Sequence, residues 1–363
     1  MNIPSYFATL PDYRVVGRCS HQLGDILGLV LCGTLADCDD FSQIEDYGKD
    51  NLAFLREELG FELANGIPSE DTLNRLIRRL KTKELEACFK SCLQAMSLVG
   101  KHLSIDGKEL RGTIPSGKKH ALVRMVNVWV DELRLSFGQL QVDKKSNEIT
   151  AIPALIDLID CAGSVVSIDA IGCQKEIVAK IREQEADYVI ALKANQGSLY
   201  QQAADFMEKR KLVLPSATSL DKAHDRGEQR TIYVANDILL VDEAREWTDL
   251  QSLIMVERTR LVGEKTETNT QLYISSLAHR MPAEFEPYTR GHWGIENHLH
   301  WQLDFTFQED NNRVKKDNGP ANLHLIRKWV LHLLQKDEEK ISLKRKRKKA
   351  NRGNQYLLKI LKT

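Results

Sequence analysis

The stretch V-V-S-I-D-A-I-G-C-Q-K-E-I-V-A-K-I-R-E-Q-E-A-D-Y-V-I-A-L-K, residues 165 to 193, decides the fold that we predict for this chain. It opens with a short apolar run that ends at Asp169, continues with a helical pattern around residues 174–184, and closes with a second apolar run that ends at Lys193. Short apolar runs of this kind are typical of buried strands, and strands separated by a helix form parallel crossovers. The stretch therefore predicts two parallel strands joined by a helix.

Upstream of this stretch the sequence has the periodicity of strands. One run ends with H-L-S-I-D at Asp106, and two further runs, residues 121–130 and 133–142, are separated by only two residues, which is hairpin length. A helix is expected around residues 149–161. This order of elements predicts a mixed sheet covered by helices: three meandering strands are followed by a helix, a strand, a second helix and a last strand. In such sheets a ligand binds beyond the carboxyl ends of strands, where strand order reverses.

Two of the predicted strands end on an aspartate, Asp106 after L-S-I and Asp169 after V-S-I. An aspartate in this position is most often a turn or helix-cap residue, so neither one alone predicts a catalytic role. A third carboxylate, Glu296, lies far away in an unusually polar segment. Two strand-borne aspartates and one helix-borne glutamate can form the oxygen cage that Mg²⁺ prefers. A pair of such ions can activate a water or a 3′-hydroxyl against a phosphodiester and stabilise the leaving oxygen.

The segment around Glu296 reads R-G-H-W-G-I-E-N-H-L-H-W-Q-L-D over residues 290–304 and predicts one amphipathic helix. Four polar residues spaced four apart share one face, namely His292, Glu296, His300 and Asp304. Three apolar residues line another face, namely Ile295, Leu299 and Leu303. For Glu296 alone, a solvated surface position is the simpler interpretation. A zinc site on this face is disfavoured, because the H-E-x-x-H spacing is missing and no fourth ligand suggests itself.

Trp293 and Trp301 flank Glu296 in the same segment. Aromatic side chains can stack on unpaired bases in single-strand sites. Packing in the interior is the alternative, and we expect it for both tryptophans.

The first hundred residues have the pattern of helices. One helix is expected over residues 21–35, another after Ser69, whose following acids suit a first turn, and a third with Thr82 at its N-cap. This predicts a small helical domain. It carries a basic stripe that could be either a solvated face or a DNA contact, made of Arg75, Arg78, Arg79 and Lys81.

Charge is segregated along the chain. The 363 residues hold 51 basic and 51 acidic side chains, yet residues 341–363 hold nine basic residues and no acid. The run K-R-K-R-K-K, residues 344–349, favours a phosphate-binding patch, with a solvated tail as the alternative.

Composition sets further bounds. The longest apolar run, Ile26 to Ala36, is far shorter than the roughly 20 residues that span a bilayer, and no secretory signal is apparent, so a cytoplasmic protein is expected. Seven cysteines without C-x-x-C predict reduced thiols, mostly in the core. The glycines form neither a P-loop nor a dinucleotide fingerprint.

Several motifs together resemble the DDE transposases of bacterial insertion sequences, and most closely the H-repeat-associated, ISAs-type branch. They are S-I-D-G-K-E-L-R-G (104–112), S-I-D-A-I-G-C-Q-K-E-I (167–177), A-L-K-A-N-Q (191–196) and R-G-H-W-G-I-E-N-H-L-H-W-Q-L-D-F-T-F-Q-E-D (290–310). The similarity extends to L-P-D-Y-R (10–14), G-I-P-S-E-D-T (66–72) and K-R-K-R-K-K-A (344–350).

The resemblance implies a ribonuclease-H-like catalytic core of the α/β class with the triad Asp106, Asp169 and Glu296. It implies Mg²⁺, with Mn²⁺ as a substitute, as the metal bound by this triad. The implied partner is double-stranded DNA bearing the inverted repeats of its own element, bound by a homodimer, with no role at a membrane. The residues expected to contact DNA are Lys108, Arg111, Lys193, Asn195, Arg290, His292, Lys344, Arg345, Lys346, Arg347, Lys348 and Lys349.

The expected organisation has five parts. These are an all-helical N-terminal domain associated with DNA (1–98), the first part of the catalytic core (99–210), a β-rich insertion (211–287), the part of the core with the glutamate helix (288–340), and a basic C-terminal tail (341–363). Much of the wider family carries Tyr, Arg, Glu and Lys at fixed spacing. Anchoring that pattern on Glu296 puts Thr289, His292 and Leu303 in the other slots, so we do not assign them the family's specific roles.

Two other functions are compatible with the sequence. One is a DNA-binding protein derived from a transposase that acts without catalysis, and the other is a metal-dependent nuclease without strand transfer. Retention of all three carboxylates argues against the first, whereas no residue separates the second from a transposase.

Overall fold

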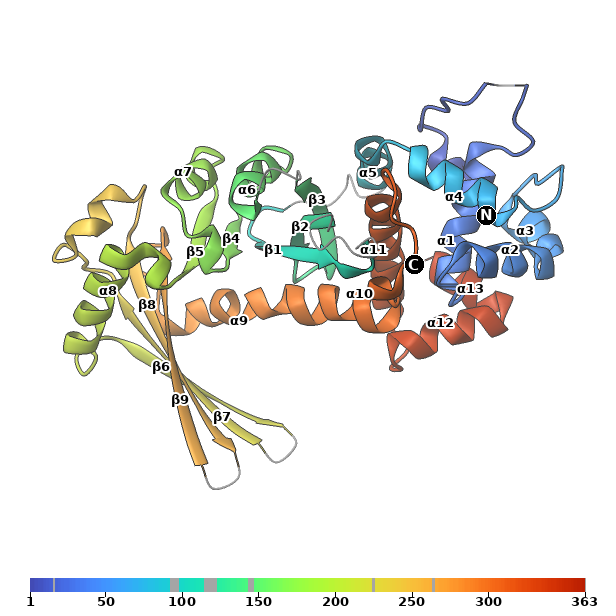
Figure 1. Cartoon of the computed structure of the whole chain (residues 1–363). Coiled ribbons are helices and arrows are strands. Elements are labelled where there is room, and N and C mark those ends of the chain that lie inside the picture. The colour runs from blue at the N-terminus through green and yellow to red at the C-terminus, as the bar shows by residue number, and fades with distance from the viewer. Residues whose placement is uncertain are drawn as a thin grey trace.

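The computed structural model describes residues 1–15, 17–91, 98–113, 123–142, 147–223, 226–262 and 265–362. A twisted sheet runs through the middle of the molecule, with a bundle of helices at one end and a long β arm at the other (Figure 1).

The described strands form one nine-stranded sheet in the order β3-β2-β1-β4-β5-β9-β8-β7-β6. The strands are β1 (His102–Leu110), β2 (Val123–Val130), β3 (Leu135–Val142), β4 (Val165–Ile168), β5 (Asp187–Leu192), β6 (Ser216–Ala223), β7 (Arg226–Ala235), β8 (Ser252–Val262) and β9 (Lys265–Ser275). Only β1–β4 and β4–β5 are parallel pairs, and the other neighbours are antiparallel. The predicted mixed sheet is confirmed, and β6 to β9 form the β-rich part expected between the second aspartate and the glutamate.

The turn between β2 and β3 is longer than expected. The sequence suggested a two-residue connection with the next strand beginning at Leu133, whereas residues 131–134 form the turn and Val130 pairs with Leu135. Arg134 has φ of +47°, a left-handed conformation that a strand cannot contain.

Helices cover both sides of the central strands. On one side α6 (Glu148–Asp157), α7 (Lys175–Glu183) and α8 (Gly197–Arg210) pack on the sheet in one hydrophobic core. On the other side, below the sheet in Figure 1, runs a long helical rod that begins with α9 (Glu286–Gly294) and contacts β1 and β4.

The N-terminal helices do not form a core of their own. They are α1 (Leu23–Leu35), α2 (Phe41–Asp50), α3 (Leu52–Leu59), α4 (Glu70–Arg79) and α5 (Thr82–Ser91). α1, α4 and α5 lie close to the predicted positions, whereas α2 and α3 were not predicted. Their buried side chains share one hydrophobic cluster with α11 (Gly319–Lys336), α12 (Leu343–Arg352) and α13 (Asn354–Leu361). The N-terminal and C-terminal parts of the chain therefore meet in one helical body.

The basic tail expected over residues 341–363 is instead folded in its described part, residues 341–362. The apolar side of α13 is buried in the shared core, with Leu357 and Ile360 both at 0% exposure. The expectation rested on the basic residues of this segment and did not consider the apolar residues of α13.

Two smaller expectations can be compared with the described residues. Five cysteines are buried and outside any disulfide, as predicted, namely Cys32, Cys38, Cys88, Cys161 and Cys173. Cys19 is exposed, and Cys92 lies outside the described residues. Within the described part of the chain, none of the helices is both long and apolar enough to cross a membrane.

Candidate metal centre

Asp106 and Asp169 stand at equivalent places on neighbouring parallel strands. β1 and β4 pair in a register that sets Ile105 against Ile168, so the next residue along each strand is an aspartate. Asp169 also caps the short 3₁₀ helix η3 (Ala170–Gly172), because its Oδ1 accepts backbone N–H groups of that turn at 3.0 and 3.4 Å. The capping role considered for this residue is thus present, together with a position beside Asp106.

Glu296 comes from the helical rod below the sheet. α9 continues into a π-helical segment, η7 (Ile295–His300), and then into α10 (Trp301–Thr306). A π turn inside a helix is uncommon and is frequent at functional sites. The predicted apolar face is confirmed, since Ile295, Leu299 and Leu303 are all at 0% exposure, whereas Glu296 is exposed.

His300 joins the carboxylates from the two elements. Its Nδ1 lies 3.1 Å from Oε2 of Glu296 and 3.5 Å from Oδ2 of Asp106, and its side chain is only 4% exposed. The ligand atoms of these three residues all lie within 4.8 Å of one another. The group contains carboxylate oxygens and one imidazole and fits a divalent cation. The described residues add no second histidine or cysteine to this group; the side chain of His292 lies outside the description.

The Asp106 carboxylate is buried and has other charged groups nearby. Burial raises the pKa of Asp106 to about 6; the neighbouring His300 opposes this rise and the nearby charge of Asp169 adds to it. A cation bound here would remove the free-energy cost of ionising Asp106 at neutral pH.

Glu148 was not among the residues expected at this site. Its carboxylate lies against Gly107, the residue that follows Asp106. Burial and the charge of Asp169 raise the pKa of Glu148. The sequence held one signal, a glycine directly after a strand-borne aspartate, but it did not identify which side chain would fill the space.

Lys108 was expected to contact DNA, and the structure contradicts this. Its side chain is 5% exposed and its Nζ lies 2.7 Å from Oδ2 of Asp304 on α10. Lys108 faces inward because it alternates with its exposed neighbour Glu109 along β1. The ion pair instead ties the glutamate-bearing rod to the strand of Asp106.

Four other expected DNA contacts differ in their exposure and partners. Arg111 and Lys193 are exposed, so both are accessible to a ligand. Asn195 is exposed, and its amide donates to the carbonyl oxygen of Ala170 at 2.7 Å, which braces the turn after Asp169. Arg290 is half exposed and forms an ion pair with Asp221 of the β arm.

The two tryptophans that flank Glu296 are exposed, so the expectation of interior packing is wrong. Trp293 is 52% exposed, with the guanidinium of Arg258 over its ring at 5.7 Å. Trp301 is 50% exposed and stacks on Phe305 with ring centroids 4.7 Å apart. They lie on the side of the rod that points away from the apolar face of Ile295.

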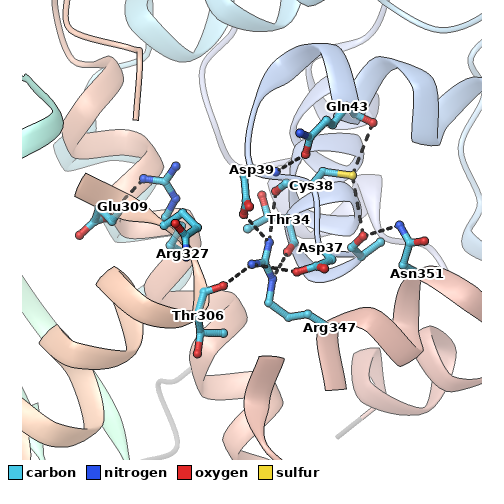
Figure 2. A network of polar contacts seen from close by, with 12 residues as sticks. Thr34, Asp37, Cys38, Asp39, Gln43, Thr306, Glu309, Arg327, Arg347 and Asn351 are labelled. Carbon is cyan, nitrogen blue, oxygen red and sulfur yellow. Dashed lines mark hydrogen bonds and ion pairs between the residues drawn. The ribbon is translucent and has the colours of Figure 1, made fainter. Parts of the chain in front are cut away.

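The basic run 344–349 is partly used inside the protein. Arg347 is fully buried, and Figure 2 shows its guanidinium at the centre of a polar network between α12 and the N-terminal helices. It donates to the carbonyl oxygens of Thr34 at 3.0 Å, Thr306 at 2.5 Å and Cys38 at 3.2 Å. Arg347 therefore cannot reach DNA, contrary to expectation, because it satisfies backbone carbonyls at helix ends.

The remaining members of this run differ in accessibility. Lys346 is buried, and its Nζ donates a hydrogen bond to the carbonyl oxygen of Leu334. The expectation that Lys346 contacts DNA is therefore also wrong. Lys349 is exposed but pairs with Glu339 at 2.8 Å. The three others have no ion pair within the described structure, namely Lys344, Arg345 and Lys348.

Comparison with known proteins places the chain among transposases by similarity. The model described as DDE_Tnp_1-associated matches residues 5–92, and the transposase DDE domain model matches residues 98–333. YncI of Escherichia coli O157:H7, named as a transposase, is 35% identical over 98% of this chain and 93% of its own length. YhhI of strain K12, named as an H repeat-associated transposase, is 33% identical over 98% of this chain and 96% of its own length. YbfQ of strain K12, named as an inactive transposase, is 37% identical over 21% of this chain and 88% of its own length.

Proposed function

Because this chain belongs to the family of DDE-domain transposases, whose core is ribonuclease-H-like, we propose that it cuts and joins DNA at the ends of an insertion sequence by metal-dependent hydrolysis and strand transfer. The observation that carries this proposal is the meeting of carboxylates from distant parts of the chain. Asp106 and Asp169 follow paired residues of adjacent strands, and the ligand atoms of Glu296, from the helical rod, lie within 4.8 Å of those of Asp106 and His300.

In the proposed site, Asp106, Asp169 and Glu296 hold Mg²⁺ or Mn²⁺. The bound ions would supply the positive charge that activates the attacking oxygen and stabilises the leaving oxygen of a phosphodiester. His300 orients Glu296 toward Asp106 through its Nδ1. The Lys108–Asp304 ion pair fixes the rod against β1, so that Glu296 faces the two aspartates.

We propose that the helical N-terminal body binds the phosphate backbone. A cavity of about 500 Å³ opens between the loop before α1 and helix α4. Three exposed arginines line it without an ion pair among the described residues, namely Arg18, Arg75 and Arg79. Arg14 also lines it but is paired with Asp12 at 2.7 Å. Unpaired arginines around a concave surface suit phosphate oxygens, which they bind through two parallel hydrogen bonds.

We propose further contacts to DNA near the site by Arg111, Lys193, Arg290 and His292, and on α12 by Lys344, Arg345 and Lys348. The inverted repeats of its own element are the proposed sequence target, and a homodimer is the proposed assembly that brings two ends together.

The proposal is tested by incubating the protein with Mg²⁺ and DNA that carries the ends of its element. Joining of a 3′ end to target DNA is expected from the wild-type chain. Asp106→Asn, Asp169→Asn and Glu296→Gln should abolish cleavage and joining while DNA binding persists, and Glu176→Gln, at an exposed position of α7, should remain active.

Two alternative outcomes identify the other functions. Cleavage without any joined product would indicate a nuclease. DNA binding by a wild-type chain that never cuts would indicate a non-catalytic DNA-binding protein, a possibility that the inactive relative YbfQ keeps open.

A further inference from the structure

Glu148 approaches the aspartates from the opposite side of the sheet to Glu296. It is the first residue of α6, whose N-terminus is fixed by Asn147, since Oδ1 of Asn147 accepts the backbone N–H of Thr150 at 3.1 Å. α6 packs on β2, β3 and the turn η3 that follows Asp169. In Figure 1 α6 lies above the sheet, whereas the rod that carries Glu296 lies below it.

The carboxylate of Glu148 occupies the space that a side chain at position 107 would need. A Cβ built on Gly107 would lie 2.4 Å from both Cδ and Oε1 of Glu148. The backbone N–H of Gly107 is donated to Oδ1 of Asp106 at 2.9 Å. The carboxylates of Asp106 and Glu148 therefore contact the same glycine from different directions.

The charge of Glu148 is not balanced within the described structure. Its half-buried carboxylate has no hydrogen bond or ion pair there, and the nearby Arg124 is held by Glu109 at 3.0 Å. A carboxylate that has no partner among the described residues and lies against the residue after Asp106 would be stabilised by a cation bound at that carboxylate.

A buried imidazole faces the same group of acids. His300 directs Nδ1 at the carboxylates of Asp106 and Glu296, and its buried Nε2 has no hydrogen-bond partner in the part of the chain that the structure describes. Because Nε2 points away from the carboxylates, the support for a ligand site comes from Nδ1, which lies beside two acids from different elements.

We propose that Glu148 is a fourth carboxylate ligand of the divalent-metal site, on the side opposite Glu296. This inference rests on the proposed function, since it concerns the same metal centre. The competing interpretation is that Glu148 only stabilises the N-terminus of α6 as a first-turn acid. Glu176 is such an acid on α7 and is exposed, so it serves as the matched control.

The test measures Mn²⁺ binding to the full-length chain without DNA, by following the electron paramagnetic resonance of free Mn²⁺. Glu148→Gln should weaken Mn²⁺ binding about tenfold or more or reduce the number of ions bound, and Glu176→Gln should bind as the wild type does. Asp106→Asn should also lose affinity. Thermal unfolding in EDTA gives a second readout. Glu148→Gln should unfold at a higher temperature than the wild type, because the substitution removes one of several negative charges that repel one another.

Gly107→Ala provides an independent variant that retains Glu148. The added methyl group would displace the flexible end of Glu148 and should weaken Mn²⁺ binding as Glu148→Gln does. If Glu148→Gln binds Mn²⁺ as the wild type does while Asp106→Asn binds it more weakly, the metal site exists but Glu148 is not one of its ligands. Undiminished binding by Asp106→Asn would instead refute the metal site of the proposed function.

Discussion

Replacing Asp106 by asparagine should stabilise the metal-free protein at neutral pH. Burial raises the pKa of Asp106 from 3.8 to about 6, so keeping it ionised above that pH costs folding free energy. At 1.36 kcal/mol per pKa unit the cost reaches about 3 kcal/mol. Asparagine has nearly the same volume, cannot ionise, and can still accept the backbone N–H of Gly107. Asp106→Asn should therefore be more stable than the wild type in EDTA at pH 7.5.

The sign of the pH dependence follows from the raised pKa. The contribution of protonated Asp106 to stability is fully present below pH 3.8, the unfolded value, and is lost as pH rises through about 6. The advantage of Asp106→Asn should thus fall to roughly half at pH 5. A chain of 363 residues unfolds with an entropy of roughly 0.8 kcal/mol/K, so the shift at pH 7.5 is about 4 °C.

Thermal unfolding followed by intrinsic fluorescence in EDTA, at pH 5 and pH 7.5, measures this shift. Asp242→Asn is the control, because Asp242 is 84% exposed on the surface and should change the unfolding temperature little at either pH. If Asp106→Asn raises the unfolding temperature equally at both pH values, or lowers it at pH 7.5, then ionisation of Asp106 does not cost folding free energy and the reasoning is refuted.

Other predictions follow from the distribution of basic residues. Arg347→Ala should destabilise the fold by about 3 to 5 kcal/mol in chemical unfolding, because the carbonyls of Thr34, Cys38 and Thr306 lose their buried donor, whereas Arg345→Ala on the exposed side of α12 should have little effect. Arg75→Gln combined with Arg79→Gln should reduce the salt slope of DNA binding by about 1.8, and Lys83→Gln should leave it unchanged; an unaltered slope in the double variant would exclude the cavity as a phosphate site. Deletion of α12 and α13 should yield insoluble or unfolded protein in a solubility and circular dichroism assay, whereas a soluble, folded product would show that these helices are dispensable.

The central features of the molecule could be predicted from periodicity. Apolar runs placed β1, β4 and β5, and Asp169 directly follows β4 as predicted. The prediction that the first strand ends at Asp106 is wrong, because β1 continues to Leu110 and Asp106 pairs with Asn127 within the sheet. Their four-residue spacing predicted that Glu296 and His300 share one helix face, and in the structure Oε2 of Glu296 lies 3.1 Å from Nδ1 of His300. These features depend on local sequence, where helix and strand periods differ clearly.

Features that depend on contacts between distant segments were not predicted. The inward position of Lys108 needs the knowledge that α10 passes beside β1. The place of Glu148 over Gly107 needs the packing of α6 on the sheet. The burial of Arg347 needs the shared core of the N-terminal and C-terminal helices, and a run of six basic residues gives no sign of which ones face inward.

The network around Arg347 has a consequence for how the chain folds during synthesis. Arg347 bonds to the carbonyl of Thr34 in α1 and to that of Thr306 at the end of the rod that carries Glu296. Both groups emerge from the ribosome long before Arg347 does, and the carbonyls lack this cation until translation has passed position 347. A chain released before position 347 would therefore lack the contact that joins α1 to the end of the rod, and the rod would depend on other contacts, among them the Lys108–Asp304 ion pair.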